Sequence, residues 1–303
     1  MTQNILRIDS VDDYNRLVGA ETLHPLVSVV DFSTLAPMYN KRCLYNIYAV
    51  FLKDIRCGDI IYGRQHYDYQ EGTVVCVAPG QIIGFEDDGQ KRQPKGWGLV
   101  FHPDFIRGTA LGRNIRDYSF FSYEANEALH LSEAERAIVT DCLQRIRGEV
   151  AHPVDRHSRR LITVHIETLL DYCLRFYERQ FTTRHAACHD TLARFEALLD
   201  DYLASGRARR EGLPTVKHFA GELCLSPNYF GDLIRKETGK SARDFIQLKL
   251  IGTAKDRLLD PGKNVSAVAY ELGFQYPQHL ARLFKKLTGQ TPNEYRRQSA
   301  AAD

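Results

Sequence analysis

Polar side chains able to read the edges of DNA bases occur in two sets near the C-terminal end of this 303-residue chain. The first set comprises Ser226, Asn228, Tyr229, Asp232, Arg235 and Lys236. The second set comprises Tyr276, Gln278, His279, Arg282, Lys285 and Lys286. Asn and Gln can form two hydrogen bonds with adenine and Arg two with guanine, while Lys and Arg neutralise phosphates. Both sets therefore predict contacts with double-stranded DNA.

The elements that must position these side chains form an internal repeat. VKHFAGELCL (216–225) aligns with VSAVAYELGF (265–274), and the register shifts by one residue after the turn. The pairs identical in the two copies are Val216/Val265, Ala220/Ala269, Glu222/Glu271, Leu223/Leu272, Pro227/Pro277, Leu233/Leu283, Lys236/Lys286, Thr238/Thr288 and Gly239/Gly289. A repeat of this kind indicates two copies of one supersecondary unit.

Each copy has the parts of a helix-turn-helix, over about 216–237 and 265–288. A small Ala lies where two helices cross, and a tight turn follows. Ser226 is spaced as an N-cap with Pro227 at the first helical position. The apolar residues expected to point inward are Phe230, Leu233, Ile234, Leu280, Leu283 and Phe284. An amphipathic helix always has a polar face, but two copies at matched spacing favour DNA recognition over mere solvation.

The segment between the copies, residues 241–260, predicts one helix of about 20 residues, roughly 30 Å long. That length approaches one turn of B-DNA, roughly 34 Å, so the helix could hold two recognition helices in successive major grooves. Gly252 in its middle costs about 1 kcal/mol relative to Ala. A last helix is predicted after Thr291, which with Glu294 has the spacing of a capping box.

Charge is unevenly distributed along the chain. Residues 207–297 carry seventeen Lys or Arg against nine Asp or Glu, whereas the remainder carries twenty-three against twenty-nine. A basic region beside an acidic remainder suggests a polyanion-binding module joined to a part that does not bind polyanions.

Residues 271–297, ELGFQYPQHLARLFKKLTGQTPNEYRR, resemble the signature of the AraC/XylS transcription regulators, and the resemblance extends over 190–297. It implies that Pro227–Glu237 and Pro277–Lys286 are the two recognition helices. The chain departs from the pattern at three positions. Tyr276 replaces a small or acidic cap, Leu280 replaces Phe, and Cys224 stands where Gly or Ala is frequent.

The rest of the chain predicts an α+β protein in two parts. Residues 20–125 contain short apolar runs separated by turn residues, which suggests a sandwich or jelly-roll barrel. Helices are predicted from Ser132, with Glu135 completing a capping box, and over about 155–181. The predicted domains are a regulatory domain (1–130), a helical dimerisation segment (131–181), a linker (182–190) and the all-α DNA-binding domain (191–299).

The family resemblance implies that the first domain is a cupin-like barrel that senses an effector. The side chains proposed to contact a small-molecule effector are Tyr48, His66, Tyr67, Tyr69, Phe85 and Trp97. The alternative is a domain that binds no small molecule and serves only dimerisation or partner docking. The apolar stripe of the 155–181 helix fits either a protein core or a contact with a second copy in a homodimer.

A second alternative is a cupin-type metal-dependent enzyme with an accessory DNA-binding domain. Such an enzyme needs clustered His and carboxylate ligands, and the nearest candidate is a single His66 followed by Asp68 and Glu71. His185, Cys188 and His189 in the linker have a spacing that suits one helical face, but no fourth ligand accompanies them. We therefore expect no enzyme activity, no catalytic residues, no metal and no cofactor.

Seven dispersed cysteines without a C-x-x-C pair indicate reduced thiols. The N-terminus lacks a signal-peptide pattern, and no apolar run approaches the roughly 20 residues that span a bilayer. We expect a cytoplasmic regulator, acting as an activator, whose partners are promoter or operator DNA, a second copy of the chain, RNA polymerase and a small-molecule effector, with no membrane partner.

Overall fold

The computed structural model describes residues 5–53, 60–62, 65–67, 72–84, 89–123, 127–183, 185–260 and 262–300. Side chains are described for all of these except 60–62, 65–67, 182–190 and 299–300. The chain divides into two compact units, Met1–Thr183 and Arg184–Asp303. The division falls inside the predicted linker 182–190, whose backbone is helical on both sides of residue 184.

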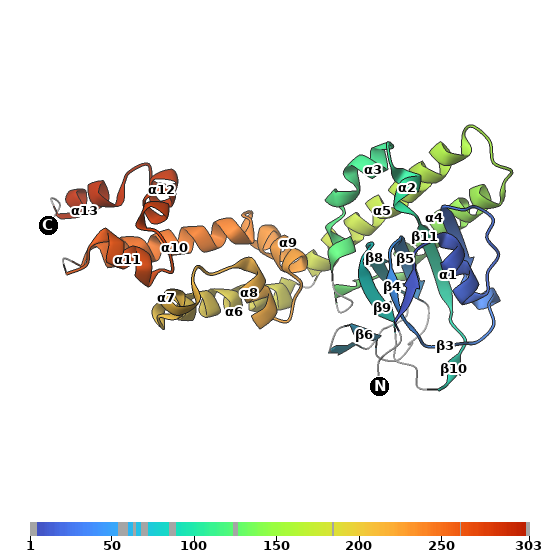
Figure 1. Ribbon diagram of the computed structural model, residues 1–303, viewed down its shortest axis with the longest axis horizontal. Helices are drawn as coiled ribbons and strands as arrows, with labels where there is room; N and C mark the ends of the chain where they lie inside the picture. The colour runs from blue at the N-terminus through green and yellow to red at the C-terminus, as the bar shows by residue number, and fades with distance from the viewer. Residues whose placement is uncertain are drawn as a thin grey trace. The chain divides into compact units, whose positions relative to one another are not determined.

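The N-terminal unit combines sheets with helices (Figure 1). Its strands are β1 (Leu6–Ile8), β2 (Val27–Asp31), β3 (Met38–Tyr39), β4 (Arg42–Tyr45), β5 (Tyr48–Lys53), β6 (Ile60–Tyr62), β7 (Gln65–Tyr67), β8 (Thr73–Val77), β9 (Gln81–Gly84), β10 (Lys91–Arg92), β11 (Gly96–Phe101) and β12 (Leu129–His130). Its α-helices are α1 (Val11–Val18), α2 (Pro103–Ile106), α3 (Ala110–Asn114), α4 (Glu133–Ala151) and α5 (Ser158–Thr183). Strands β2 to β11 all lie within residues 20–125, which confirms the prediction that this segment is rich in β-strands.

The largest sheet has the antiparallel order β12-β8-β5-β11-β2, and a smaller sheet has the order β1-β4-β9 with β1 parallel to β4. The remaining strands pair as β10-β3 and β6-β7. Within the described residues these sheets are open and none closes into a barrel. The jelly-roll prediction is therefore confirmed only as a β-rich unit, and the cupin-like form stays a prediction.

The two faces of the five-stranded sheet pack against different partners because successive strand residues point to opposite sides. On one face Ala49 and Phe51 join a core with Val11 and Tyr14 of α1 and with residues of the smaller sheet. On the other face Trp97 of β11 lies beside Arg147 of α4. Because both faces are covered, strands such as β8 are buried along their whole length.

The predicted helices of this unit are present. Ser132 caps α4, and the Glu135 carboxylate accepts a hydrogen bond from the Ser132 backbone amide, as the sequence predicts. The helix predicted over about 155–181 is α5, and its Arg179 forms an ion pair of 2.7 Å with Glu135. No helix in the described part of the chain is long and apolar enough to cross a membrane.

The C-terminal unit is built from helices alone in its described residues. They are α6 (His185–Ala204), α7 (Arg207–Glu211), α8 (Val216–Glu222), α9 (Pro227–Thr238), α10 (Ala242–Leu258), α11 (Val265–Glu271), α12 (Pro277–Thr288) and α13 (Pro292–Ala300). The long α10 packs against α9 at one side and α11, α12 and α13 at the other (Figure 1). It is therefore the scaffold that the two repeats share.

Candidate nucleic-acid interface

The first repeat forms a helix-turn-helix of α8 and α9. Thr215 caps α8 and Ser226 caps α9, where its hydroxyl accepts a hydrogen bond of 3.2 Å from the Tyr229 amide. Phe195 of α6 packs edge-on against Phe219 of α8 and Phe230 of α9, with ring centroids 5.2 and 4.9 Å apart. These contacts fix α9 against the body of the unit, so its other face is held in a defined orientation.

The second repeat forms the same motif from α11 and α12. Asn264 caps α11, whereas Tyr276 at the N-cap of α12 makes no capping hydrogen bond with its side chain. Leu280 and Phe284 of α12 are fully buried, and Phe284 contacts Tyr295 of α13 at 5.6 Å between ring centroids. Thr291 and Glu294 make the predicted reciprocal hydrogen bonds at the start of α13.

The connecting helix is shorter than predicted. α10 has 17 residues, from Ala242 to Leu258, because Ser241 caps it and Leu259 ends it. At 1.5 Å per residue its length is about 26 Å, which still covers most of one turn of B-DNA. Ion pairs anchor the second repeat nearby: Glu271 of α11 lies 3.3 Å from Arg257 and 2.8 Å from Lys263. Glu271 thereby links α11 to the end of α10 and to the segment that follows it.

The polar set of α12 lies on the surface as the sequence predicts. Its exposed members are Tyr276, Gln278, His279, Arg282, Lys285 and Lys286. Their exposure follows from the helical spacing, since Leu280 and Phe284 occupy the opposite side. This face presents one amide, one imidazole and three cationic side chains. These groups can form hydrogen bonds with base edges and neutralise phosphates.

The polar set of α9 is only partly exposed. Asn228, Arg235 and Lys236 are exposed, and Asp232 is half-buried. The prediction that Tyr229 lies on the exposed face is wrong: only 7% of this residue is accessible. Tyr229 precedes Leu233 by four residues, so it lies over the same buried side of the helix.

Ser226 differs from the prediction in a similar way. It is 2% exposed, and its hydroxyl caps α9. Its capping role is as predicted, but its side chain does not belong to the exposed face. The first repeat therefore presents Asn228, Arg235 and Lys236 with Asp232 among them.

The predicted effector residues do not gather at one site. Tyr48 stacks on Phe101 and Trp97 lies beside Arg147, both on the α4-facing side of the large sheet. Tyr69 and Phe85 lie outside the described residues, as do the side chains of His66 and Tyr67 in β7. The cavity of the N-terminal unit opens on the other side of the sheet, where neither Tyr48 nor Trp97 is among its lining residues.

The enzyme alternative gains no support from the structure. Among the described side chains, no three His, Cys, Asp or Glu residues gather as ligands of a metal ion. The side chains of His66, His185, Cys188 and His189 lie outside that description.

Comparisons with known proteins agree with this geometry. A family model described as "Helix-turn-helix domain" matches residues 219–298. The uncharacterized HTH-type transcriptional regulator YijO of Escherichia coli K12 is 26% identical over 191 residues, 62% of either chain. The arabinose operon regulatory protein of the same organism is 32% identical over 81 residues, 27% of this chain and 28% of its own. This chain thus spans less than two thirds of the length of these relatives.

Solved structures also resemble parts of the chain. The C-terminal domain of the response regulator yesN from Fusobacterium nucleatum has a TM-score of 0.32 and 21% identity, covering 35% of this chain and 98% of that one. The DNA-binding domain of AdpA in complex with a target DNA has a TM-score of 0.29 and 24% identity, covering 33% and 94%.

Proposed function

We propose that this chain, whose C-terminal unit carries an AraC-type helix-turn-helix domain, is a sequence-specific transcription regulator that binds double-stranded DNA through α9 and α12. One observation carries the proposal: a single unit holds two recognition helices on a shared α10, each with polar side chains exposed and apolar side chains buried. The relatives named as transcriptional regulators support it.

The two recognition helices present different side chains, so one subunit reads an asymmetric site. Asn228 corresponds to Gln278, and Asp232 to Arg282. The residues that follow Asn228 and Gln278 differ in exposure: Tyr229 is buried, whereas His279 is exposed. Identical recognition helices would read a repeated sequence, whereas these helices require two unlike half-sites.

Binding to a specific sequence is tested by selecting sites from random duplexes with the full chain and measuring affinities by gel shift. Arg282→Ala should weaken binding to the selected site by about 10- to 100-fold, the loss of roughly 1–3 kcal/mol for one base contact. Arg145→Ala is the matched control, because Arg145 is an exposed arginine paired with Asp141 on α4 of the other unit. Equal affinity for all duplexes of the same length would contradict the proposal.

We further propose that the chain forms homodimers through α5. Leu161 and Val164 lie three residues apart on α5 and are 43% and 48% exposed. Such neighbouring apolar side chains on one helix face suit a second copy of the same helix. Light scattering should give the mass of a dimer for the full chain and of a monomer for Leu161→Glu/Val164→Glu; a monomeric parent chain would reject the dimer.

The direction of regulation is proposed as activation through RNA polymerase in the cytoplasm, with an effector bound by the N-terminal unit. Transcription in vitro from a promoter carrying the selected site should rise when the chain is added to RNA polymerase. A fall in transcript would show repression instead.

A further inference from the structure

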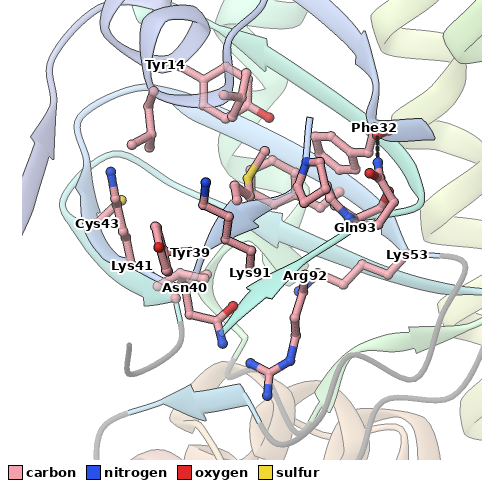
Figure 2. Close-up of a pocket in the computed structure, with 18 of the residues that line it drawn as sticks. Tyr14, Phe32, Tyr39, Asn40, Lys41, Cys43, Lys53, Lys91, Arg92 and Gln93 are labelled. Carbon is pink, nitrogen blue, oxygen red and sulfur yellow. Dashed lines mark hydrogen bonds between the residues drawn. The ribbon is translucent and has the colours of Figure 1, made fainter. Parts of the chain in front are cut away.

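A cavity of about 390 Å³ opens in the N-terminal unit beside α1 and the five-stranded sheet (Figure 2). Its volume falls within the range of roughly 300–1,000 Å³ that holds small molecules. Its apolar lining is formed mainly by aromatic and aliphatic side chains: Tyr14, Phe32, Tyr45, Phe51 and Ile83. Phe51 lies at the centre of the aromatic group. Its ring centroid is 5.9 Å from that of Tyr45 and 6.2 Å from that of Tyr14. The cavity therefore suits an apolar body.

The glycine at position 98 of β11 makes room for this aromatic group. A Cβ atom at Gly98 would lie 2.7 Å from Cζ of Phe32 and 2.8 Å from the Tyr14 hydroxyl oxygen. Any larger residue would displace one of the two rings. The shape of the cavity lining thus depends on a residue without a side chain.

Cations surround this apolar lining. They are Lys41, Lys53, Lys91, Arg92 and Lys95. None of the lining residues in the described part of the chain is acidic. Residues 1–183 contain four lysines, and all four line the cavity. Outside residues 207–297 the chain has more Asp and Glu than Lys and Arg. The cations of the lining therefore belong to a part of the chain whose net charge is negative.

Lys91 contacts an aromatic residue of the cavity lining. It lies opposite Tyr39 in the β10–β3 pair, and its Nζ is 5.2 Å from the centre of the Tyr39 ring. Arg92 follows Lys91 on the same strand, and Figure 2 shows its guanidinium extending away from Lys91. Lys41 directly precedes β4, two residues after the end of β3, and it is exposed.

The polar groups of the lining supply no negative charge to balance the lysines. Burial raises the pKa of the Cys43 thiol to about 11 and raises the pKa values of the Tyr14 and Tyr45 hydroxyls. All three groups are therefore neutral at physiological pH. The Tyr14 hydroxyl is also buried without a hydrogen-bond partner among the described residues, which makes its burial costly.

We infer that this cavity binds a small amphipathic carboxylic acid, aromatic or medium-chain aliphatic, with its apolar body on the aromatic group around Phe51 and its carboxylate at Lys91 and Lys41. A neutral apolar ligand would make no use of the charges of Lys91 and Lys41, and a small inorganic anion would leave the apolar lining uncovered. A metal cation is disfavoured by the surrounding positive charge. The inference deepens the proposed function by naming the chemical class of the effector, and it rests on that function only for the regulatory consequence.

The test is isothermal titration calorimetry of the full chain with octanoate and 4-phenylbutyrate, each compared with its neutral primary amide. At least one acid should bind about tenfold or more tightly than its amide, since one charge-assisted contact contributes roughly 1.5–3 kcal/mol. Lys91→Gln should reduce acid binding by about tenfold and leave amide binding unchanged. Arg145→Gln on α4, an exposed cation away from the cavity lining, is the control and should have no effect.

Two results would overturn the inference: no acid binding up to about 1 mM, or equal binding of acid and amide. Lys91 is exposed, so its substitution should not unfold the unit; a normal melting temperature for Lys91→Gln verifies this. Gel shifts with the same preparation separate the two proposals. A chain that binds its selected DNA but neither acid rejects the ligand class alone, and a chain that binds an acid but no specific DNA rejects the regulator alone.

Discussion

The two helix-turn-helix copies differ most at their turns. Cys224 adopts a positive φ of 56° in the first copy and is exposed. Gly273 takes its place in the second copy with φ of 87°, and a Cβ there would lie 2.6 Å from the carbonyl oxygens of Ala208 and Gly212. α7 and the residue after it thus pack directly on the second turn. The same backbone shape is tolerated by a cysteine where space is open and needs glycine where another segment approaches.

The copies also differ at the N-termini of their recognition helices. Ser226 caps α9 and is buried, while Tyr276 leaves α12 without a side-chain cap and is 55% exposed. Tyr276 instead lies edge-on to His279, with ring centroids 5.5 Å apart. The first copy has the better-capped helix and the second copy presents more polar groups and cations. Both copies keep the helix-turn-helix core. They differ in how the recognition helix is capped and in which polar side chains it exposes.

Substitution of the turn residues should show the largest difference in stability between the two copies. Gly273→Ala should destabilise the C-terminal unit by about 3 kcal/mol, because it combines a strained φ with contacts to backbone that cannot move aside. Cys224→Gly should be neutral or stabilise by up to about 1 kcal/mol, since it removes the left-handed strain of a residue with a Cβ. Hydrogen exchange of α8, α9, α11 and α12 amides in the full chain measures both. Equal effects at the two turns would refute the difference in packing.

Exchange of the caps should have an intermediate effect. Ser226→Ala should cost about 1 kcal/mol by leaving the Tyr229 amide without its partner. Tyr276→Ser should stabilise by about 0.5–1 kcal/mol by supplying the cap that α12 lacks. Thermal unfolding of the full chain should move in opposite directions for the two variants. A loss of stability for Tyr276→Ser would mean that the Tyr276–His279 contact outweighs a cap.

A substitution in the shared helix should affect both copies alike. Gly252 of α10 is exposed, and nothing lies within 4 Å of a Cβ built there. Gly252→Ala should therefore stabilise the unit by about 0.8 kcal/mol through helix propensity. Hydrogen exchange should slow in both copies, and affinity for DNA should not change. Protection gained in only one copy would contradict the role of α10 as a common scaffold.

Removal of the acidic side chain from the first copy should have the smallest effect. Asp232 stands at the position that corresponds to Arg282, so it opposes the phosphates that Arg282 attracts. Asp232→Asn should tighten binding to any duplex by about two- to threefold, the size of one screened like-charge interaction in water. Gel shifts at two salt concentrations measure it, with Asp141→Asn on α4 as the control. Weaker binding would show that Asp232 contacts a base or positions a neighbour instead.

Much of the C-terminal unit could be predicted from the sequence because its signals are local. The caps Ser226 and Thr291 and the buried Leu280 and Phe284 all follow from spacing within one or two helical turns. The prediction for Tyr229 is wrong because the residue lies on the buried side of α9. Its spacing of four from Leu233 already indicated the core side of the helix.

The cavity could not be predicted in the same way. Both faces of the large sheet are buried, so the alternation that tells one strand face from the other is missing. Trp97 and Phe51 therefore looked alike in the sequence, although they lie on opposite faces. The cavity also needs Tyr14 from a short helix before the strands and Lys91 from a two-residue strand paired with β3. Those contacts are non-local, and no short motif encodes them.

The most direct test of the central claim, that the unlike copies read successive major grooves, is hydroxyl-radical footprinting of the full chain on its selected site with Arg235→Ala and Arg282→Ala. The parent chain should protect two segments about 10 base pairs apart. Arg235→Ala should weaken protection of one segment and Arg282→Ala of the other, with the greater loss for Arg282→Ala. Loss of the same segment in both variants, or a single protected segment for the parent chain, would contradict the account.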